Sequence, residues 1–182
     1  TGVAPAQKQP NVLFLLSDNH RWDQMGCSGN PIVSTPNIDN LASNGTRFSN
    51  AFVTTPICAA SRASFLTGLY ERTHQYTFNT PPLKSCFANI SYPSVLKASG
   101  YYTGFIGKFG IESGKGGIGL ENSDKTLYKM FDQFDNFEHW GIIKGSPKGY
   151  FVDQPDGTKR HLTEVTGDKV VDFLNGRDSD QP

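Results

Sequence analysis

The sequence predicts an α/β protein in which a mostly parallel sheet is flanked by helices. Short apolar runs that end in polar residues alternate with segments of helical periodicity, and short connections join them. A chain of 182 residues is long enough for one domain with a hydrophobic core. The alternation stops after a helix, where another strand should follow, so we expect the pattern to be cut off partway through a larger sheet.

The first predicted strand covers about residues 11–17, because "NVLFLLS" is apolar like a strand buried inside a parallel sheet. A helix is predicted next, from Thr35 as the cap to Gly45 as the stop, with Pro36 in its first turn and one apolar face. A second strand is expected over residues 47–52.

The middle of the chain continues the alternation. A helix is predicted over residues 59–69, ending near Gly68, and another over residues 92–99, with a proline near its start. The strand "YYTGFIG" follows at residues 101–107 and places Lys108 at its carboxyl end.

Beyond Gly110 the pattern is weaker. We expect a glycine-rich loop over residues 111–124, an aromatic segment of mixed periodicity over residues 127–140, and a hairpin that turns at residues 155–157. A last helix is predicted from Thr163, with Gly176 as its stop and an apolar face made of Val170, Val171, Phe173 and Leu174.

One apparent motif carries no weight. Residues 114–119 match G-x-G-x-x-G, the dinucleotide-binding fingerprint, by letter. Polar residues without helical periodicity follow where the fingerprint needs a helix to open, so we expect a loop and not a nucleotide site.

The composition excludes several classes of function. Lys plus Arg and Asp plus Glu both number 17, so no overall field attracts nucleic acid or an anionic membrane. No apolar run approaches the roughly 20 residues of a membrane span, so we expect no membrane insertion.

Three widely spaced cysteines, Cys27, Cys58 and Cys86, predict neither a disulfide scaffold nor a structural zinc site. The small, polar residues at the amino terminus suit an exported chain, so we expect a periplasmic or secreted protein.

Reactive residues follow the predicted strands and open one helix. Asp18 and Asn19 come after the first strand, Lys108 after the third, and Cys58 begins a helix with Arg62 one turn later. Ligands of open parallel sheets bind at the carboxyl ends of the strands. Oxygen donors at positions 18 and 19 favour calcium or magnesium, and the helix start with the two cations suits a tetrahedral oxyanion such as sulfate or phosphate. A thiolate pairs badly with a hard cation, which indicates an oxygen nucleophile at position 58.

The motif "CAASR", followed by "ASFLTG", resembles the signature of the type I sulfatases of the alkaline phosphatase superfamily. The segments "NVLFLLSDNHRWDQMGCSGN", "GLYERTH", "GYYTGFIGKFG" and "TEVTGDKVVDFL" are similar to other parts of that family. The resemblance implies that residues 1–182 are the amino-terminal part of a sulfatase catalytic domain. It also implies that Cys58 is converted to formylglycine, whose hydrate attacks the sulfur of a sulfate ester.

The resemblance assigns roles residue by residue. Asp18, Asn19 and the modified Cys58 would bind one calcium ion, Arg62 would steady the formylglycine, and Lys108 would bind sulfate. The implied partners are a sulfated small molecule or glycan, with a carbohydrate sulfate preferred, and the enzyme that generates formylglycine.

The sequence departs from the family in ways that bear on activity. Asn19 stands where a second aspartate is usual, which predicts weaker metal binding, and Gly110 stands where many members have a histidine base. The second pair of metal ligands has no counterpart in these 182 residues. A phosphonate or phosphodiester hydrolase of the same superfamily and a catalytically inert fragment therefore remain alternatives. His74 is expected to be structural, and His20 is a weaker candidate for substrate contact.

Overall fold

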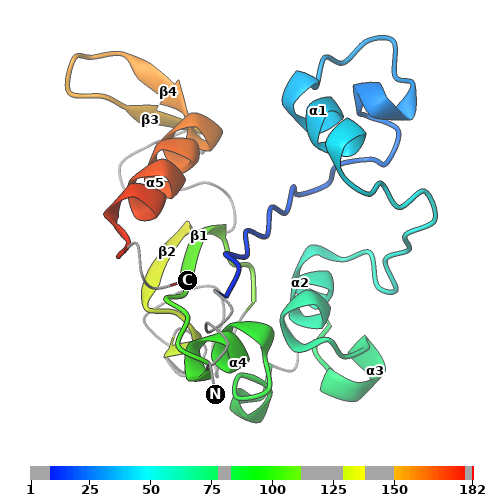
Figure 1. The fold of residues 1–182 in the computed structure, drawn as a ribbon, viewed down its shortest axis with the longest axis vertical. Helices are drawn as coiled ribbons and strands as arrows, with labels where there is room; N and C mark the ends of the chain where they lie inside the picture. Colours follow the sequence, from blue (N-terminus) through cyan, green and yellow to red (C-terminus); the bar gives the residue numbers. More distant parts are fainter. Residues whose placement is uncertain (1–8, 78–82, 112–128, 138–149, 179–181) are drawn as a thin grey trace, which may run out of the picture. The chain divides into compact units, whose positions relative to one another are not determined.

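A computed structural model of the chain describes residues 9–77, 83–111, 129–137, 150–178 and 182 (Figure 1). By its internal contacts the chain divides into two units, one of Leu13–Thr54 and one of Thr1–Val12 with Thr55–Pro182. We call these the small unit and the large unit. The glycine-rich loop expected over residues 111–124, apart from Ile111, and the two ends of the aromatic segment expected over residues 127–140 (residues 127–128 and 138–140) lie outside the described residues.

The small unit contains the short helix η1 (Gly26–Ser28) and the helix α1 (Pro36–Asn44). Thr35 and Gly45 flank α1 as predicted. The Thr35 hydroxyl does not cap the helix, however: it accepts the Gly26 N–H at 2.8 Å and donates to Asp39 at 2.9 Å. Hydrogen bonds therefore join α1 to η1.

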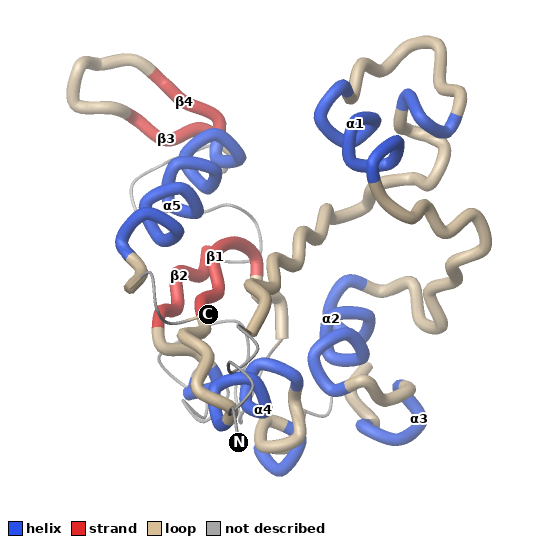
Figure 2. Tube along the Cα trace, in the orientation of Figure 1, coloured by secondary structure: helices blue, strands red, loops and turns tan. Residues whose placement is uncertain are grey.

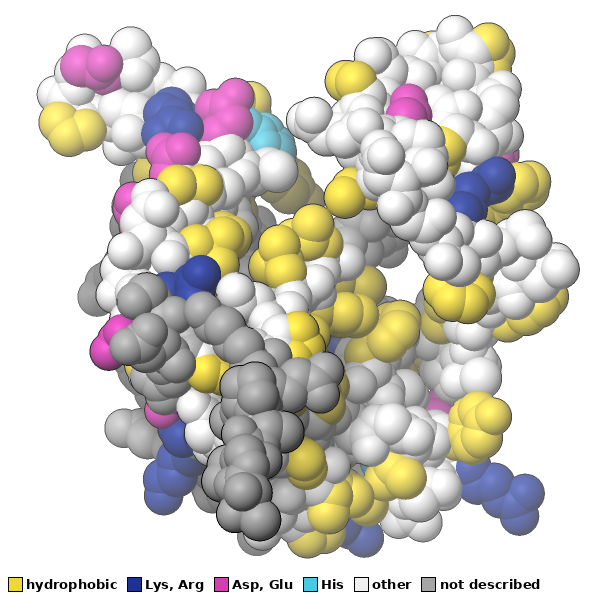
Figure 3. Space-filling view, in the orientation of Figure 1, with side chains coloured by type: hydrophobic (Ala, Val, Ile, Leu, Met, Phe, Trp, Pro, Cys, Tyr) yellow, Lys and Arg dark blue, Asp and Glu magenta, His cyan; other side chains and the backbone are white. Residues whose placement is uncertain are grey.

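Both strands predicted in the first 54 residues are wrong. Residues 11–17 and 47–52 form no strand, and the apolar side chains from Val12 to Leu16 are 40–69% exposed. Hydrophobic side chains accordingly reach the surface of the small unit (Figure 3). Apolar composition predicts a strand only if a neighbouring strand accepts its hydrogen bonds, and among the described residues neither segment has such a neighbour.

The large unit contains the expected parallel pair of strands (Figure 2). Strand β1 (Gly104–Lys108) pairs with β2 (Gln133–Phe137) from Gly104 opposite Gln133 to Lys108 opposite Phe137. The predicted strand at residues 101–107 is therefore confirmed, although it begins three residues later and includes Lys108. Strand β2 was not predicted.

Helices pack on both faces of this pair. On one face, Phe105 belongs to an aromatic core with Phe109, Phe131 and Phe134, whose ring centroids lie 5.2–6.3 Å apart. Small residues of helix α2 (Cys58–Thr67) join that core. Side chains alternate along a strand, so Gly104 faces the other way. There Phe173 of helix α5 (Leu162–Gly176) occupies the space that a side chain at position 104 would fill.

Two of the remaining helices of the large unit contact α2. Helix α2 ends at Gly68, as expected, and α3 (Glu71–His74) follows it without having been predicted. After η2 (Ser85–Phe87), helix α4 (Tyr92–Ala98) matches its prediction. Together with the parallel strands, these elements confirm the α/β class.

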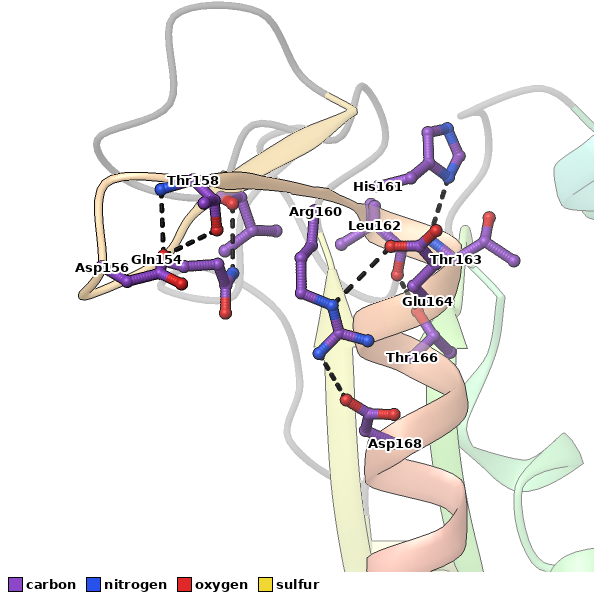
Figure 4. Close-up of polar contacts among 11 residues, drawn as sticks. Gln154, Asp156, Thr158, Arg160, His161, Leu162, Thr163, Glu164, Thr166 and Asp168 are labelled. Carbon is purple, nitrogen blue, oxygen red and sulfur yellow. Dashed lines mark hydrogen bonds and ion pairs between the residues drawn. The ribbon is translucent and has the colours of Figure 1, made fainter.

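The predicted hairpin and last helix are also present. Strand β3 (Phe151–Asp153) pairs antiparallel with β4 (Lys159–His161), and β4 leads directly into α5. The His161 ring accepts the Thr163 N–H at 3.2 Å and so caps α5, while Arg160 reaches Glu164 and Asp168 on the helix (Figure 4). No described helix has both the length and the apolar character that crossing a membrane requires.

Candidate functional site

Cys58 is the first residue of α2, directly after the extended residue Ile57. The first backbone N–H groups of a helix have no acceptor within the helix, so they carry partial positive charge at this end. The Cys58 side chain is half-buried against the hydrophobic core. The position therefore combines a fixed backbone with a side chain near the positive end of a helix.

Arg62 connects this helix to the sheet. Its guanidinium donates a hydrogen bond to the backbone carbonyl of Lys108, the last residue of β1. Because β1 and β2 are parallel, Lys108 lies at their common carboxyl end. The structure thus brings the side chain of Arg62, on the helix that begins with Cys58, to the backbone of Lys108 at the end of β1.

The backbone after Lys108 is fixed by a residue that the sequence did not single out. The side-chain oxygen of Asn136, in β2, accepts the Phe109 N–H at 2.9 Å. Phe109 itself is 2% exposed within the aromatic core. Asn136 could not be found from the sequence because β2 was not recognised as a strand.

Helix α3 holds the α2 segment on both sides of Cys58. The Thr55 hydroxyl donates to the Glu71 carboxylate at 2.8 Å, three residues before Cys58, and Ser64 hydrogen-bonds His74 Nε2 at 3.0 Å. The two partners, Glu71 and His74, are the first and last residues of the four-residue helix α3. The segment that contains Cys58 and Arg62 is therefore anchored at two points.

His74 makes its contacts as a neutral ring. Its Nδ1 accepts the Tyr76 N–H at 3.1 Å, so Nε2 carries the proton and donates to Ser64. Burial lowers the pKa of His74, and the nearby Glu71 carboxylate opposes this only in part. These contacts agree with the structural role expected for His74.

Asp18 and Asn19 belong to the small unit, so the structure does not place them relative to Cys58. Asn19 has a left-handed backbone with φ of 55°. The neighbouring His20 is held within the same loop by Ser17 and by the Gln24 carbonyl. Within the described parts of the chain, no three His, Cys, Asp or Glu side chains come together as a metal site. The ligand set Asp18, Asn19 and Cys58 stays a prediction.

Comparisons with known proteins agree on one family. The family model described as Sulfatase matches residues 10–182. The chain is 30% identical to the N-acetylglucosamine-6-O-sulfatase of Bacteroides thetaiotaomicron over 96% of its own length and 29% of that protein. It is 29% identical to an arylsulfatase of Clostridium perfringens over 96% of its length and 41% of that protein. The chain thus spans less than half of these relatives.

Solved structures give the same result for the fold. One, determined in complex with its substrate D-glucosamine-2-N,6-O-disulfate, has a TM-score of 0.71 at 26% identity, covering 96% of this chain and 33% of that one. The phosphonate monoester hydrolase of Agrobacterium radiobacter also has a TM-score of 0.71, at 22% identity, over 95% of this chain and 39% of that one. The second likeness bears on the fold alone.

Proposed function

Because the chain belongs to the sulfatase family, we propose that the protein is a sulfuric ester hydrolase that removes sulfate from a sulfated carbohydrate. The observation that carries the proposal is the hydrogen bond from Arg62 to the Lys108 carbonyl, which joins the helix of Cys58 to the end of β1. Relatives named for glucosamine and ulvan sulfates favour a carbohydrate substrate.

The nucleophile in this proposal is formylglycine made from Cys58. One hydroxyl of the hydrated aldehyde loses its proton and attacks sulfur, and the S–O bond to the alcohol breaks as the alcohol oxygen takes up a proton. The second hydroxyl then loses its proton as the C–O bond to sulfate breaks, which releases inorganic sulfate and restores the aldehyde. No net oxidation occurs in the cycle.

The chain's own groups supply the charge that this reaction needs. The N–H groups at the start of α2, with Arg62 and Lys108, would bind the sulfuryl oxygens and stabilise the negative charge that grows on them in the transition state. Arg62 is held in place by the Lys108 carbonyl, so little reorganisation is required. Gly110 offers no proton acceptor, so a different group must assist the elimination step.

The donors proposed for a metal suit calcium. Asp18 offers a carboxylate, Asn19 a carbonyl, and the formylglycine hydrate a hydroxyl, all of them hard oxygen ligands. An unmodified thiol at position 58 would not fit such an ion. When bound, calcium lowers the pKa of the hydroxyl and neutralises charge on the sulfate ester.

We also propose where the protein works and how it matures. We propose that the protein works in the periplasm or outside the cell, on the basis of the small, polar residues near its amino terminus. Its maturation would require a formylglycine-generating enzyme as a partner.

The alternative activity is hydrolysis of a phosphonate or phosphodiester by the same nucleophile. The fold is shared with a phosphonate monoester hydrolase, so the fold does not separate the two reactions. Parallel assays with a sulfated glucosamine, an aryl sulfate and an aryl phosphodiester distinguish the two reactions, because these substrates differ in the group that is transferred. Faster turnover of the phosphodiester would replace the sulfatase proposal.

The decisive experiment combines peptide mass and activity in the full-length protein made with a maturation enzyme. We expect the peptide with Cys58 to be about 18 Da lighter than the thiol form and Cys58→Ala to abolish sulfate release. Cys86→Ala removes an exposed thiol of the same unit and should retain activity. An unmodified, inactive protein in a host that matures other sulfatases would favour the inert alternative.

A further inference from the structure

A single peptide group at the end of β1 is held from both sides. Its carbonyl, which belongs to Lys108, accepts the hydrogen bond from the Arg62 guanidinium. Its N–H, which belongs to Phe109, donates to the side-chain oxygen of Asn136 at 2.9 Å. A trans peptide group is planar, with its C=O and N–H pointing in opposite directions, so the direction of one fixes the direction of the other. Arg62 and Asn136 therefore act on the same rigid unit from opposite sides.

The place of Asn136 in β2 explains how it reaches this peptide group. The parallel ladder ends where Lys108 lies opposite Phe137, and Phe109 is the next residue after the strand. Side chains alternate along a strand, so Asn136 lies on the same face as Phe134, which packs against the hydrophobic core. The Asn136 side chain thus continues the ladder by one hydrogen bond, on the face of the sheet where α2 packs.

Burial alone does not set the direction of this peptide group. Phe109 is 2% exposed, so its ring fixes where residue 109 lies. The peptide plane can still rotate about the line through its two flanking Cα atoms, because φ and ψ are the soft dihedrals of the backbone. Such a rotation would turn the Lys108 carbonyl away from Arg62. The hydrogen bond to Asn136 opposes the rotation, because the N–H would move away from this acceptor.

We propose that Asn136 is a positioning residue: it holds the peptide group whose carbonyl binds Arg62, and so keeps the guanidinium in place for an oxyanion. The two hydrogen bonds strengthen each other, because a carbonyl that is bonded to a cation polarises the N–H of the same peptide group. Asn136 acts through the peptide group and needs no contact with the substrate.

The inference deepens the proposed function and rests on it where the oxyanion is the sulfate of an ester. Hydrogen exchange at the Phe109 amide and affinity for inorganic sulfate require no turnover, so the two ideas can fail separately. If the unaltered protein binds sulfate but hydrolyses no sulfate ester, the function is wrong and the role of Asn136 is still measured. If the unaltered protein binds no sulfate, the role of Asn136 in holding an anion site is overturned.

Asp132 provides a matched control at the opposite end of the same strand pair. Its carboxylate accepts the Thr103 N–H at 2.9 Å, directly before β1, as Asn136 accepts an N–H directly after β1. It also accepts the Thr103 hydroxyl at 3.0 Å and pairs with Lys97 at 2.7 Å. Asp132→Ala therefore removes at least as many of these contacts as Asn136→Ala, but at the end of β1 opposite to the one that Arg62 contacts.

The first measurement is hydrogen exchange at the Phe109 amide, relative to the core amides of α2, in the matured full-length protein. We expect Asn136→Ala to speed this exchange by about tenfold or more, and Asn136→Asp, which keeps an acceptor, to restore slow exchange. Arg62→Ala should speed it too, because the guanidinium acts on the same peptide group. If Asn136→Ala speeds the exchange and Arg62→Ala does not, the two bonds are independent and the proposal is wrong.

The second measurement compares sulfate binding, by calorimetry, with kcat and KM. We expect Asn136→Ala to weaken sulfate binding by about threefold to tenfold and to lower kcat/KM by at least as much, as when a hydrogen bond to a charged group is impaired. Asp132→Ala should stay within about twofold of the unaltered protein in both measurements, although it lowers stability at least as much. Equal effects of the two substitutions would show that activity only follows stability, and would overturn the proposal.

A second variant, Asn136→Leu, covers the case in which Asn136→Ala does not fold. Leucine fills a similar volume but offers no acceptor, so it should show the same faster exchange and weaker sulfate binding. If both variants stay unfolded while Asp132→Ala folds, Asn136 is required for the fold itself and has no separate positioning role.

Discussion

The two units of the chain are stabilised in different ways. In the large unit an aromatic core around Phe109 fixes the end of β1 and the residues that follow it. In the small unit no residue is buried, and hydrogen bonds to Asp39 hold η1 against α1. Hydrophobic packing therefore positions Lys108 and Gly110, whereas polar contacts shape the unit that contains Asp18.

The largest effect is expected from truncating equal side chains in the two units. Phe109→Ala removes a core ring and should lower the free energy of unfolding by about 3–5 kcal/mol. Phe48→Ala, in the small unit where Phe48 is 79% exposed, should change it by less than about 0.5 kcal/mol. Urea denaturation of both variants measures this difference. A large cost for Phe48→Ala would contradict this difference between the units, because it would mean that the small unit has its own buried core in solution.

The next effect concerns His74, which is 1% exposed in the large unit. His74→Ala leaves the Tyr76 N–H and the Ser64 hydroxyl without their partner, which should cost about 2–3 kcal/mol of unfolding free energy. Thermal unfolding at pH 8 measures this cost. His161→Ala is the comparison: that imidazole is exposed and caps α5, so its removal should cost only about 1 kcal/mol.

The pKa of His74 also sets a direction for the pH dependence. Burial lowers the folded pKa below the ordinary 6.5, so the unfolded chain binds more protons between the two values. Stability contributed by neutral His74 is complete above pH 6.5 and decreases as the pH falls below it. The slope of stability against pH in this window should flatten in His74→Ala. An unchanged slope would show that another group titrates there.

Much of the fold could be predicted from local signals, and the failures have a common cause. Proline near a helix start or glycine near a helix end marked α1, α2, α4 and α5 correctly. Strands depend on partners that are distant in sequence. Residues 12–16 are apolar but form no strand with another described segment, whereas β2, with the polar sequence "QFDN", forms because Phe134 fills the core and Asp135 meets Lys169 of α5.

The candidate site divides in the same way. Cys58, Arg62 and Lys108 could be named from the motif and from the ends of their elements, and the structure joins the last two through a hydrogen bond. Glu71 and Asn136 could not be named, because they act through hydrogen bonds across 16 and 27 residues of sequence. Asp18 and Asn19 lie in the other unit, so their part in the site stays a prediction.

A smaller, local effect is expected for Asp39 in the small unit. Its carboxylate accepts the Cys27 N–H at 2.7 Å, and this bond is the main reason that its pKa lies below the usual 3.8. Asp39→Ala should speed hydrogen exchange at the Cys27 amide by about tenfold or more while leaving the core amides of the large unit unchanged. Asp23→Ala, which removes an exposed ion pair with Arg21, is the control. Loss of protection in both units would show that they unfold together.

Asp39, like His74, makes stability decrease as the pH falls. The folded state favours the charged form of Asp39, whereas it favours the neutral form of His74. The folded pKa of Asp39 is lowered, so its contribution is present above pH 3.8 and is lost as the pH falls through the folded value. The large unit should therefore begin to lose stability at a higher pH than the small unit. Exchange rates of the two units followed from pH 7 to pH 3 test this order.

The smallest effect is expected at the surface of the large unit, where Arg160 of β4 pairs with Asp168 of α5 at 2.5 Å (Figure 4). Asp168 is 60% exposed, so solvent screens this ion pair. The Arg160 guanidinium nevertheless lowers the pKa of the Asp168 carboxyl. Arg160→Gln should shift the melting temperature by less than about 2 °C, and the shift should become smaller in about 0.5 M salt, where the Debye length falls to about 4 Å. Asp135→Asn, which removes the contact of β2 with Lys169, is the matched comparison for an ion pair that joins α5 to the sheet. If Arg160→Gln lowered the free energy of unfolding as much as His74→Ala, polar surface contacts would stabilise the large unit as they stabilise the small unit. Hydrophobic packing would then not distinguish the two units.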